Sequence, residues 1–260
     1  PLPGRPPPAL EPPPALAVNR RWGRELLGRA VDTRLGLDTL AASRIADAAA
    51  LDAVFARVSA AQHEWAARPA ADRAAVLHRA GEMLAARRGA LLEIMAHEAG
   101  KTIAEGDPEV SEATDFAHYY AERGLALEAV EGAEFVPARI TVVTPPWNFP
   151  VAIPAGGVLA ALAAGNAVLQ KADDQAVLTV LTLRRALVDA GLHEAVGQVV
   201  TGPGDPVGDA VVDAGDHIAF TGGPNAGRAV VRNSAENLAS TSLELGGKSP
   251  FVVFADADLE

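Results

Sequence analysis

The stretch ITVVTPPWNFPVAIPAGGVLAALAAGNAVLQK, residues 140–171, decides the fold because its pattern changes several times. A short β-type run is followed by a proline-rich turn, an Ala/Leu segment, a Gly-Asn stop and a second apolar run. A strand, a helix and a strand at this spacing predict a parallel βαβ unit. Residues 151–169 would be about long enough to span a bilayer as one helix, but Pro154 and the glycines break the run, so we expect no membrane segment.

The chain after this stretch repeats the alternation of strand-like and helix-like segments. Further strands are expected at 197–202, 217–222, 241–246 and 250–254, and further helices at 177–191, 205–214 and 224–233. This alternation predicts an α/β fold, a doubly wound Rossmann-like parallel sheet with helices on both faces. Ligands bind beyond the carboxyl ends of the strands in such sheets, so the residues that follow each strand are the candidates for a site.

The chain before residue 138 has a helical pattern instead, with apolar residues at helical spacing from about 45 to 131. Asp107 is well placed as an N-cap, with Pro108 at the first helical position. One apolar stripe is interpreted as core packing: Phe116, Tyr119 and Tyr120. The many prolines at the start predict an extended linker. The expected division is a proline-rich linker at 1–20, an N-terminal helical part at 21–137 and a Rossmann-like part at 138–260.

Composition restricts the partners of this 260-residue chain. Acidic residues outnumber basic ones 33 to 22, and the formal charge of -11 opposes binding to nucleic acid or to an anionic membrane. The basic pair Arg87-Arg88 is interpreted as an ordinary solvated helix end. No signal peptide is visible, so we expect a cytoplasmic protein with no nucleic-acid or membrane partner.

Cysteine and histidine usage restricts the chemistry. The chain has no cysteine, which excludes a disulfide or a thiol nucleophile within it. Its six histidines show no close metal-ligand spacing, so we interpret them as scattered surface or helix residues and expect no metal.

Two strand ends carry polar groups that could do chemistry. Lys171 ends a strand and Asp174 follows three residues later; together they could hold the hydroxyls of a ribose, and the carboxylate would disfavour a 2′-phosphate. The alternative is a solvated lysine beside a helix N-cap. In PPWNFP, three prolines fix the backbone and aim the Asn148 side-chain amide, which makes it a candidate oxyanion donor.

Glycine-rich turns follow three other strands. TGPGDPVG, residues 201–208, and TGGPNAG, residues 221–227, are each a weak signal for a phosphate site, because neither matches G-x-G-x-x-G. In LELGG, Glu244 interrupts an apolar run and is followed by one leucine and then by Gly246 and Gly247. An acidic side chain at a strand end is a candidate proton acceptor.

These motifs together resemble the aldehyde dehydrogenase superfamily. TPPWNFPVAIPAGGVLAALAAGNAVLQKADDQ, IAFTGG and LELGGKSPFVVFADADLE occur in that family's order and spacing, over roughly residues 45–260. The resemblance implies that a cysteine attacks an aldehyde, that Asn148 holds the oxyanion, that hydride passes to NAD, and that Glu244 activates the water that hydrolyses the thioester. It implies an NAD site formed by Pro146, Trp147, Lys171, Asp174, Gly204, Gly208, Thr221, Gly222, Gly223, Leu245 and Gly246.

A narrower resemblance bears on the substrate. HEAGKTIAEGDPEVSEATDFAHYYAE is similar to the 1-pyrroline-5-carboxylate dehydrogenase branch, and the proline-rich start with NRRWGRELLGRA resembles bifunctional bacterial proline-utilisation proteins. This implies oxidation of L-glutamate γ-semialdehyde to glutamate in proline catabolism, by an enzyme that is a homo-oligomer when full length. Another aldehyde substrate such as succinate semialdehyde, or a non-catalytic nucleotide-binding module, remains as an alternative.

The sequence departs from the family pattern in three places. KADD replaces the usual KPxE, and Gly223 and Asn225 replace the usual serine and acidic residue after FTG. The family's cysteine would lie beyond residue 260. We therefore expect a C-terminally truncated chain that lacks the catalytic cysteine domain, with DADLE as the first turn of an interrupted helix. Alone it should be catalytically inactive and bind NAD weakly.

Overall fold

The computed structural model describes residues 12–202, 207–247 and 250–258, and these form one sheet of five parallel strands. The strands are β1 (Ile140–Thr144), β2 (Ala167–Lys171), β3 (Gly197–Val200), β4 (His217–Gly222) and β5 (Ser240–Leu245). Their order across the sheet is β3-β2-β1-β4-β5. The chain runs outward from β1 to β3 and returns to place β4 beside β1, so the topological switch point lies between β1 and β4. The predicted doubly wound α/β fold is confirmed.

The middle of the sheet is well buried. Val142 of β1 lies beside Leu169 of β2 on one side and Ile218 of β4 on the other. All three side chains are fully buried. Strands covered on both faces are expected to read as near-continuous apolar runs, and in β1 and β2 only Thr141 and Gln170 are polar among the buried positions.

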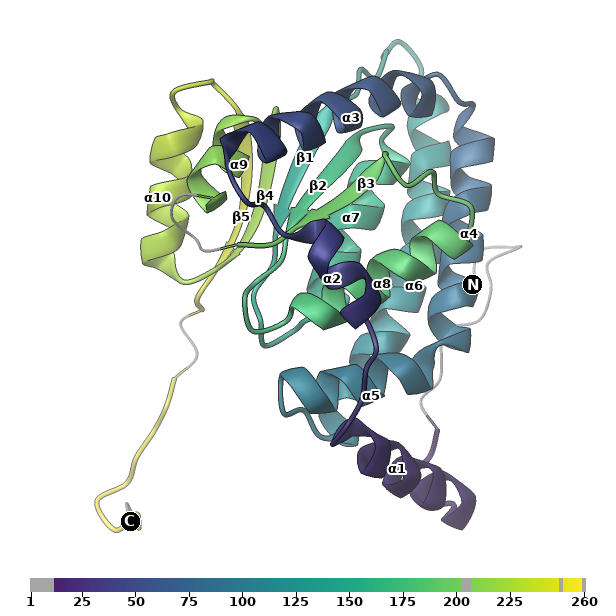
Figure 1. The fold of residues 1–260 in the computed structure, drawn as a ribbon, viewed down its shortest axis with the longest axis vertical. Helices are drawn as coiled ribbons and strands as arrows, with labels where there is room; N and C mark the ends of the chain where they lie inside the picture. The colour runs from purple at the N-terminus through teal and green to yellow at the C-terminus, as the bar shows by residue number, and fades with distance from the viewer. Residues whose placement is uncertain (1–11, 203–206, 248–249, 259–260) are drawn as a thin grey trace.

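Helices cover the two faces of the sheet unequally. α7 (Ala152–Ala163) and α8 (Val177–Asp189) follow β1 and β2 on one face, whereas α3 (Ala48–Ala66) crosses the opposite face of the same strands (Figure 1). α9 (Asp209–Asp213) and α10 (Pro224–Ser234) accompany β4 and β5. On β5, Ser240, Ser242 and Glu244 are exposed, so one face of this strand is open among the described residues.

The N-terminal helices pack beside the sheet and share its core. They are α1 (Ala17–Ala30), α2 (Leu37–Ser43), α4 (Ala70–Ala86), α5 (Arg88–Glu98) and α6 (Ile103–Glu128). α6 packs against both α4 and α7. One continuous cluster of buried side chains extends from Leu26 of α1 to Val230 of α10. The boundary expected at residues 137 and 138 is therefore crossed by a common core, and the division itself stays a prediction.

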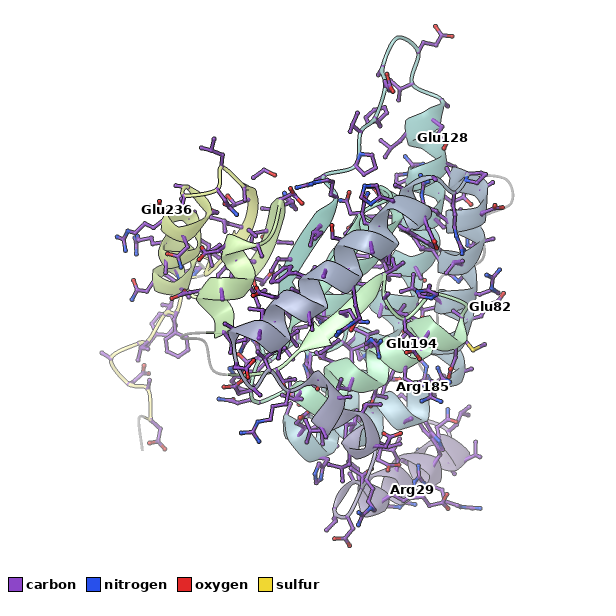
Figure 2. All side chains as sticks on the ribbon, turned by 45° about the horizontal axis from the view of Figure 1, so that its top comes forward. Arg29, Glu82, Glu128, Arg185, Glu194 and Glu236 are labelled. Carbon is purple, nitrogen blue, oxygen red and sulfur yellow. The ribbon has the colours of Figure 1, made fainter. Side chains whose placement is uncertain are left out.

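Charged side chains lie around this core. Arg29 of α1 and Arg185 of α8, both labelled in Figure 2, have side chains that are 54% and 61% exposed. Among the described residues, the structure contains no helix with the length and apolar character needed to cross a membrane.

The predicted start of α6 is wrong. Thr102 is the N-cap, and it forms a capping box with Glu105. Asp107 and Pro108 lie inside the helix. Asp107 is buried and accepts a hydrogen bond from Arg88 Nη1 at 2.5 Å. A stronger capping signal one turn earlier and a buried ion pair thus override the local Asp-Pro signal.

The interpretation of Arg87 and Arg88 as a solvated pair is also wrong. The Arg88 side chain is only 12% exposed because it pairs with Asp107, and Arg87 forms an ion pair with Asp189 of α8. The aromatic stripe of α6 is divided: Phe116 and Tyr120 pack against the core, whereas Tyr119 is 45% exposed. The core-packing interpretation therefore fails for Tyr119.

The end of the described chain differs from the expectation. Residues 250–254 have no regular structure, and Phe251 and Phe254 are 92% and 74% exposed. A strand needs a neighbour for its backbone hydrogen bonds, and no described segment pairs with this one. Residues 255–258 contain a turn and no helix, while the last two residues of DADLE lie outside the described residues.

Several element ends are also displaced from those expected. α1 begins at Ala17, inside the expected linker, where Arg20 Nη1 donates hydrogen bonds to the carbonyls of Pro14 and Ala15. β3 ends at Val200, and α9 spans only five residues. Such shifts of a few residues are ordinary for ends that are set by capping contacts.

Candidate functional site

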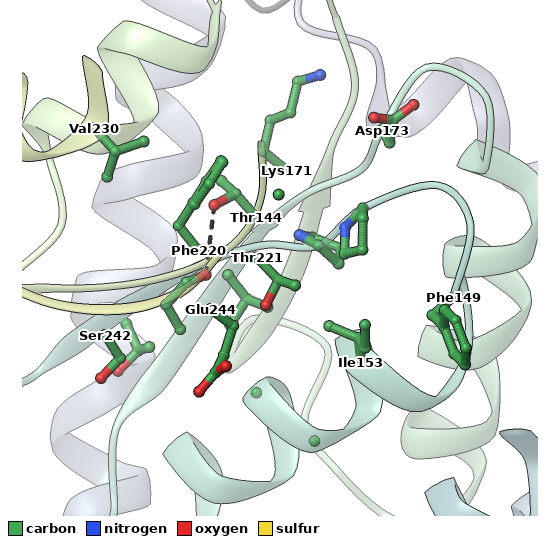
Figure 3. Close-up of a pocket in the computed structure, with 18 of the residues that line it drawn as sticks. Thr144, Phe149, Ile153, Lys171, Asp173, Phe220, Thr221, Val230, Ser242 and Glu244 are labelled. Atoms are coloured by element: carbon green, nitrogen blue, oxygen red, sulfur yellow. Dashed lines mark hydrogen bonds between the residues drawn. The ribbon is translucent and has the colours of Figure 1, made fainter. Parts of the chain in front are cut away.

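A cleft of about 1510 Å³ lies at the switch point and extends from the carboxyl ends of the strands along the sheet to Thr141, Asn166 and His217 (Figure 3). Lys171 and Asp173 lie at one end of this view, and Ser242 and Glu244 at the other. The predicted site residues that line the cleft are Pro146, Trp147, Asn148, Lys171, Gly208, Thr221, Gly222, Gly223, Glu244, Leu245 and Gly246. Asp174 is not among its lining residues, and Gly204 lies outside the described residues. The structure thus brings nearly all of these residues together.

The PPWNFP segment joins the end of β1 to the start of α7. Thr144 Oγ1 donates to Ala219 O of β4 at 3.4 Å, and Pro150 is buried just before α7. Between these two anchored ends Trp147 and Phe149 are 44% and 43% exposed. Asn148 is exposed as well and lines the cleft. The segment therefore presents an amide to the cleft from a fixed backbone, as the prolines indicate.

Glu244 reaches the same cleft from β5, where it pairs with Thr221 of β4. It alternates with residues that point to the other side, so Ser242 and Glu244 share one face. Figure 3 shows these two side chains on the same side of the sheet as Ile153 of α7. An exposed carboxylate and an amide that line one cleft can accept a proton from water and stabilise an oxyanion.

A polar cluster that the sequence did not indicate continues along this face. His217 Nδ1 lies 2.8 Å from Ser240 Oγ, and His217 Nε2 lies 3.2 Å from Ser242 Oγ. Burial lowers the pKa of His217 below the ordinary histidine value. The three residues lie on paired strands, a contact that only the register of β4 and β5 reveals.

The end of β2 holds the predicted lysine and carboxylate close together. Lys171 Nζ lies 3.3 Å from Asp174 Oδ1, with side chains 12% and 60% exposed. Asp173 was not predicted as a site residue, but it lines the cleft, and its Oδ1 accepts a hydrogen bond from Gln175 N at 2.9 Å. The sequence KADD offers two carboxylates, and only the structure separates the one that pairs with the lysine from the one that closes the turn.

The glycines of the cleft differ in what they allow. A Cβ added at Gly208 or Gly223 would meet no heavy atom within 4 Å, and one at Gly246 would meet only Pro224 Cδ at 4.0 Å. At Gly222 the same atom would lie 2.7 Å from Phe220 Cζ. Three of these positions therefore leave open space in which a ligand can approach the backbone, while a side chain at Gly222 would displace the end of the Phe220 ring.

No group of three or more His, Asp or Glu in the described ranges is arranged to hold a metal ion. The interpretation of the histidines as scattered is nevertheless wrong for two of them. His78 Nδ1 and His118 Nδ1 lie 2.8 Å apart, between α4 and α6, and the rings stack at 5.2 Å. The pair is far apart in sequence, so residue spacing could not have found it.

Comparisons with known proteins identify similar sequences. A family model described as "Aldehyde dehydrogenase family" matches residues 35–260. A putative succinate-semialdehyde dehydrogenase [NADP(+)] of Mycolicibacterium smegmatis is 34% identical over 220 residues, 80% of this chain and 43% of the relative. An alpha-ketoglutarate semialdehyde dehydrogenase of Haloferax volcanii is 36% identical over 223 residues, 81% of this chain and 45% of the relative. This chain thus spans less than half the length of these curated relatives.

Solved structures of similar fold include proline utilization A (PutA) from Corynebacterium freiburgense. That structure has a TM-score of 0.80 and 35% identity, and the match covers 92% of this chain and 24% of the other. The NADP-dependent glyceraldehyde-3-phosphate dehydrogenase from Bacillus halodurans, complexed with NADP, has a TM-score of 0.72 and 31% identity, covering 80% of this chain and 47% of the other.

Proposed function

This chain belongs to the aldehyde dehydrogenase family, and we propose that it supplies the cofactor-binding part of an enzyme that oxidises an aldehyde to an acid with NAD. The observation that carries the proposal is the shared cleft of Asn148 and Glu244 at the switch point of the sheet. An oxyanion donor and a proton acceptor are the two groups that this chemistry needs besides a nucleophile.

The cleft fits a dinucleotide. Its volume of about 1510 Å³ exceeds the ~300–1,000 Å³ of pockets that hold drug-sized ligands, so an extended ligand can lie in it. Lys171 and Asp174 would bind the adenosine ribose hydroxyls, while the open backbone at Gly223 and Gly246 would face the pyrophosphate and nicotinamide. The bound nicotinamide would supply the hydride acceptor. Several similar proteins are named as NADP-dependent, but the Asp174 carboxylate would repel a 2′-phosphate, which favours NAD here.

The residues of the chain would act in two steps. The chain has no cysteine, so the nucleophile would come from a part of the protein outside residues 1–260. When the thiolate adds to the aldehyde carbon, the Asn148 amide would donate a hydrogen bond to the developing oxyanion. After hydride transfer leaves a thioester, Glu244 would take a proton from water as the water attacks the carbonyl carbon, which releases the acid and the thiolate.

L-Glutamate γ-semialdehyde is the substrate that we propose. The match to the PutA structure covers 92% of this chain, including much of the N-terminal region, whereas the match to the glyceraldehyde-3-phosphate dehydrogenase covers 80%. Succinate semialdehyde is the second candidate, because the similar protein of M. smegmatis bears that name. Steady-state rates of the full-length protein with pyrroline-5-carboxylate and with succinate semialdehyde should give the larger kcat/KM for the former. The reverse order would reject the proposed substrate.

The proton acceptor is tested by Glu244→Gln in the full-length protein. The variant should keep a rapid first turnover of NADH but lose steady-state rate, because thioester hydrolysis needs the carboxylate and hydride transfer does not. An unchanged steady-state rate would contradict the assignment.

Residues 1–260 alone should form no NADH with aldehyde, and added NAD should raise their melting temperature only slightly. Aldehyde-dependent NADH from that chain would overturn the assigned need for an outside nucleophile.

A further inference from the structure

The PPWNFP segment contacts a lysine from another part of the chain, which is not among the predicted site residues. Lys101, between α5 and α6, donates a hydrogen bond from Nζ to Asn148 O at 2.8 Å. The same ammonium lies 4.3 Å from the centroid of the Phe149 ring and forms an ion pair with Glu109 of α6. The Lys101 side chain is 11% exposed and that of Glu109 1%. A charge this well buried is expected to have specific partners. Two of its partners, the Asn148 carbonyl and the Phe149 ring, belong to the segment that carries the proposed oxyanion donor.

Glu109 anchors the other side of Asn148. Its second oxygen, Oε2, accepts hydrogen bonds from Val151 N at 3.0 Å and Ala152 N at 3.1 Å. These are N–H groups at the start of α7, which has no side-chain cap from its own N-cap residue. A carboxylate from α6 therefore caps α7 and complements the positive end of its dipole.

The two contacts bracket Asn148 within one ion-paired unit. Its carbonyl is bound to Lys101, and the backbone N–H groups three and four residues later are bound to Glu109. Catalytic geometry requires donors fixed to within about 0.5 Å, and a side-chain amide can be no better placed than its own backbone. The pair thus restrains a stretch of the cleft wall whose side chains Trp147, Asn148 and Phe149 are exposed.

A second buried ion pair on the same helices provides a comparison. Arg88 of α5 and Asp107 of α6 have side chains 12% and 7% exposed, close to the values for Lys101 and Glu109. Arg88 directs its hydrogen bonds to Asp107 and Ser111, both within α6. The Arg88 pair therefore joins two helices, whereas the Lys101 pair reaches beyond them to the cleft.

We propose that Lys101 and Glu109 are positioning residues of the oxyanion site: their ion pair holds the backbone of Asn148 so that its amide stays directed at the reacting oxygen. This inference rests on the proposed function, since it requires Asn148 to be the oxyanion donor. It assigns the pair an effect on the chemical step and none on cofactor affinity.

A double-mutant cycle in the full-length protein tests the inference, with NADH formation as the readout. Asn148→Ala should lower kcat by about 10²–10³-fold, the usual loss for one oxyanion donor. Lys101→Met, which keeps the apolar stem, should lower kcat roughly 10-fold at unchanged KM for NAD, and Lys101→Arg should recover part of it. In the Asn148→Ala background, Lys101→Met should have no further effect on kcat, because it acts through that amide.

The matched control is Arg88→Met, which removes the comparison pair. It should lower the melting temperature as much as Lys101→Met does and leave kcat unchanged. Hydrogen exchange supplies a readout that needs no activity: Glu109→Gln should speed exchange at the Val151 and Ala152 amides, since it weakens the cap on α7. This measurement also serves if Lys101→Met folds poorly.

The outcomes separate the two proposals. If Asn148→Ala slows kcat but Lys101→Met slows it by the same factor in both backgrounds, the positioning role is wrong and the proposed function stands. Equal kcat losses in Lys101→Met and Arg88→Met would likewise reduce the pair to a structural contact. Unchanged exchange at Val151 and Ala152 in Glu109→Gln would reject the capping step. An unchanged kcat in Asn148→Ala would overturn the oxyanion assignment and the positioning role together.

Discussion

The two halves of the sheet, a buried half of β1, β2 and β3 and an open half of β4 and β5, differ in cover although their strands are alike in length. In β1 and β2 the first four residues are buried, because helices lie on both faces. In β5 the residues alternate between exposed and half-buried up to Glu244, and α10 packs beside the strand. The buried half gives fixed starting points for the PPWNFP segment and Lys171. The open half leaves the carboxylate of Glu244 accessible, so rigidity and access are provided by different strands.

The largest test of this comparison removes the same side chain from each half. Leu169 of β2 is fully buried, and Leu169→Ala should lower the free energy of unfolding by about 2–5 kcal/mol through lost burial and a cavity. Leu243 of β5 is only half-buried, so Leu243→Ala should cost about 1 kcal/mol or less. Urea unfolding midpoints with a common slope measure both changes. Equal losses would show that the open half is as well packed as the buried one.

The buried half is also the half that sequence reasoning described best. The two strands expected within residues 140–171 are present as β1 and β2, since a strand covered on both faces leaves a mainly apolar run, and α7 ends at Ala163, just before Gly165-Asn166. The turns that carry the site residues could be named before the structure because they follow strand ends, and parallel strands bring their carboxyl ends to one edge. Most of the individual residues are implied by the resemblance to the aldehyde dehydrogenase superfamily. What that reasoning provides is membership of the cleft; the roles within it stay predictions.

The errors come from contacts between segments far apart in the chain. Asp107 has the local signature of an N-cap, but Arg88 holds it inside α6. Lys101 and Glu109 carry no motif that points to Asn148, since their contact with the segment depends on how α6 packs against α7. Residues 250–254 have strand-like composition, yet pairing decides whether a strand forms. Composition indicates what a segment can form, and its neighbours decide the outcome.

A second prediction concerns the ligand that the buried half presents at the end of β2. Asp174→Asn removes the charge beside Lys171, so the affinity for NADP relative to NAD should rise by about 10-fold, or about 1.4 kcal/mol. Asp173→Asn is the comparison variant: Asp173 lines the cleft, but it closes the turn through Gln175 N and does not pair with Lys171, so it should change the ratio less. Titration of each cofactor measures the ratio. A larger change in the Asp173 variant would exchange the roles of the two carboxylates.

A third, smaller effect concerns the pH dependence of stability at two histidine sites, the His78–His118 pair and the His217 cluster. The pKa of His118 is lowered by burial and then by His78, while Asp115 and Glu82 oppose the shift; the pKa of His217 on the open half is lowered by burial alone. His118 also contacts His78, whose Nε2 lies 3.3 Å from Glu122 Oε1. A histidine whose folded pKa is lowered binds its proton more readily when unfolded. Its stabilising contribution is therefore full above about pH 6.5 and is lost as the pH falls from there towards the folded pKa.

The measurement is the unfolding free energy between pH 7.5 and about 5 for His118→Gln and His217→Gln, compared with the unchanged protein. Each variant should lose less stability on acidification than the parent, because each removes a histidine whose pKa is lowered in the folded protein. Parallel pH profiles for His118→Gln and the parent would exclude this histidine as an acid-sensitive contact between α4 and α6.

The smallest expected effect is at Gly223, the N-cap of α10 on the open half of the sheet. Its backbone is extended, with φ -70° and ψ 149°, and a Cβ there would meet no heavy atom within 4 Å. Gly223→Ser should therefore fit without strain and raise the free energy of unfolding by a few tenths of a kcal/mol, because a serine oxygen can accept a hydrogen bond from the first turn.

The hydroxyl of Gly223→Ser would also line the cleft, so the dissociation constant for NAD should fall about 2- to 5-fold, the value of one added hydrogen bond. Gly247→Ser is the control, since this glycine is equally open but is not one of the residues that line the cleft. A gain in stability with no gain in affinity would place the pyrophosphate away from α10 and move the proposed cofactor path towards β5.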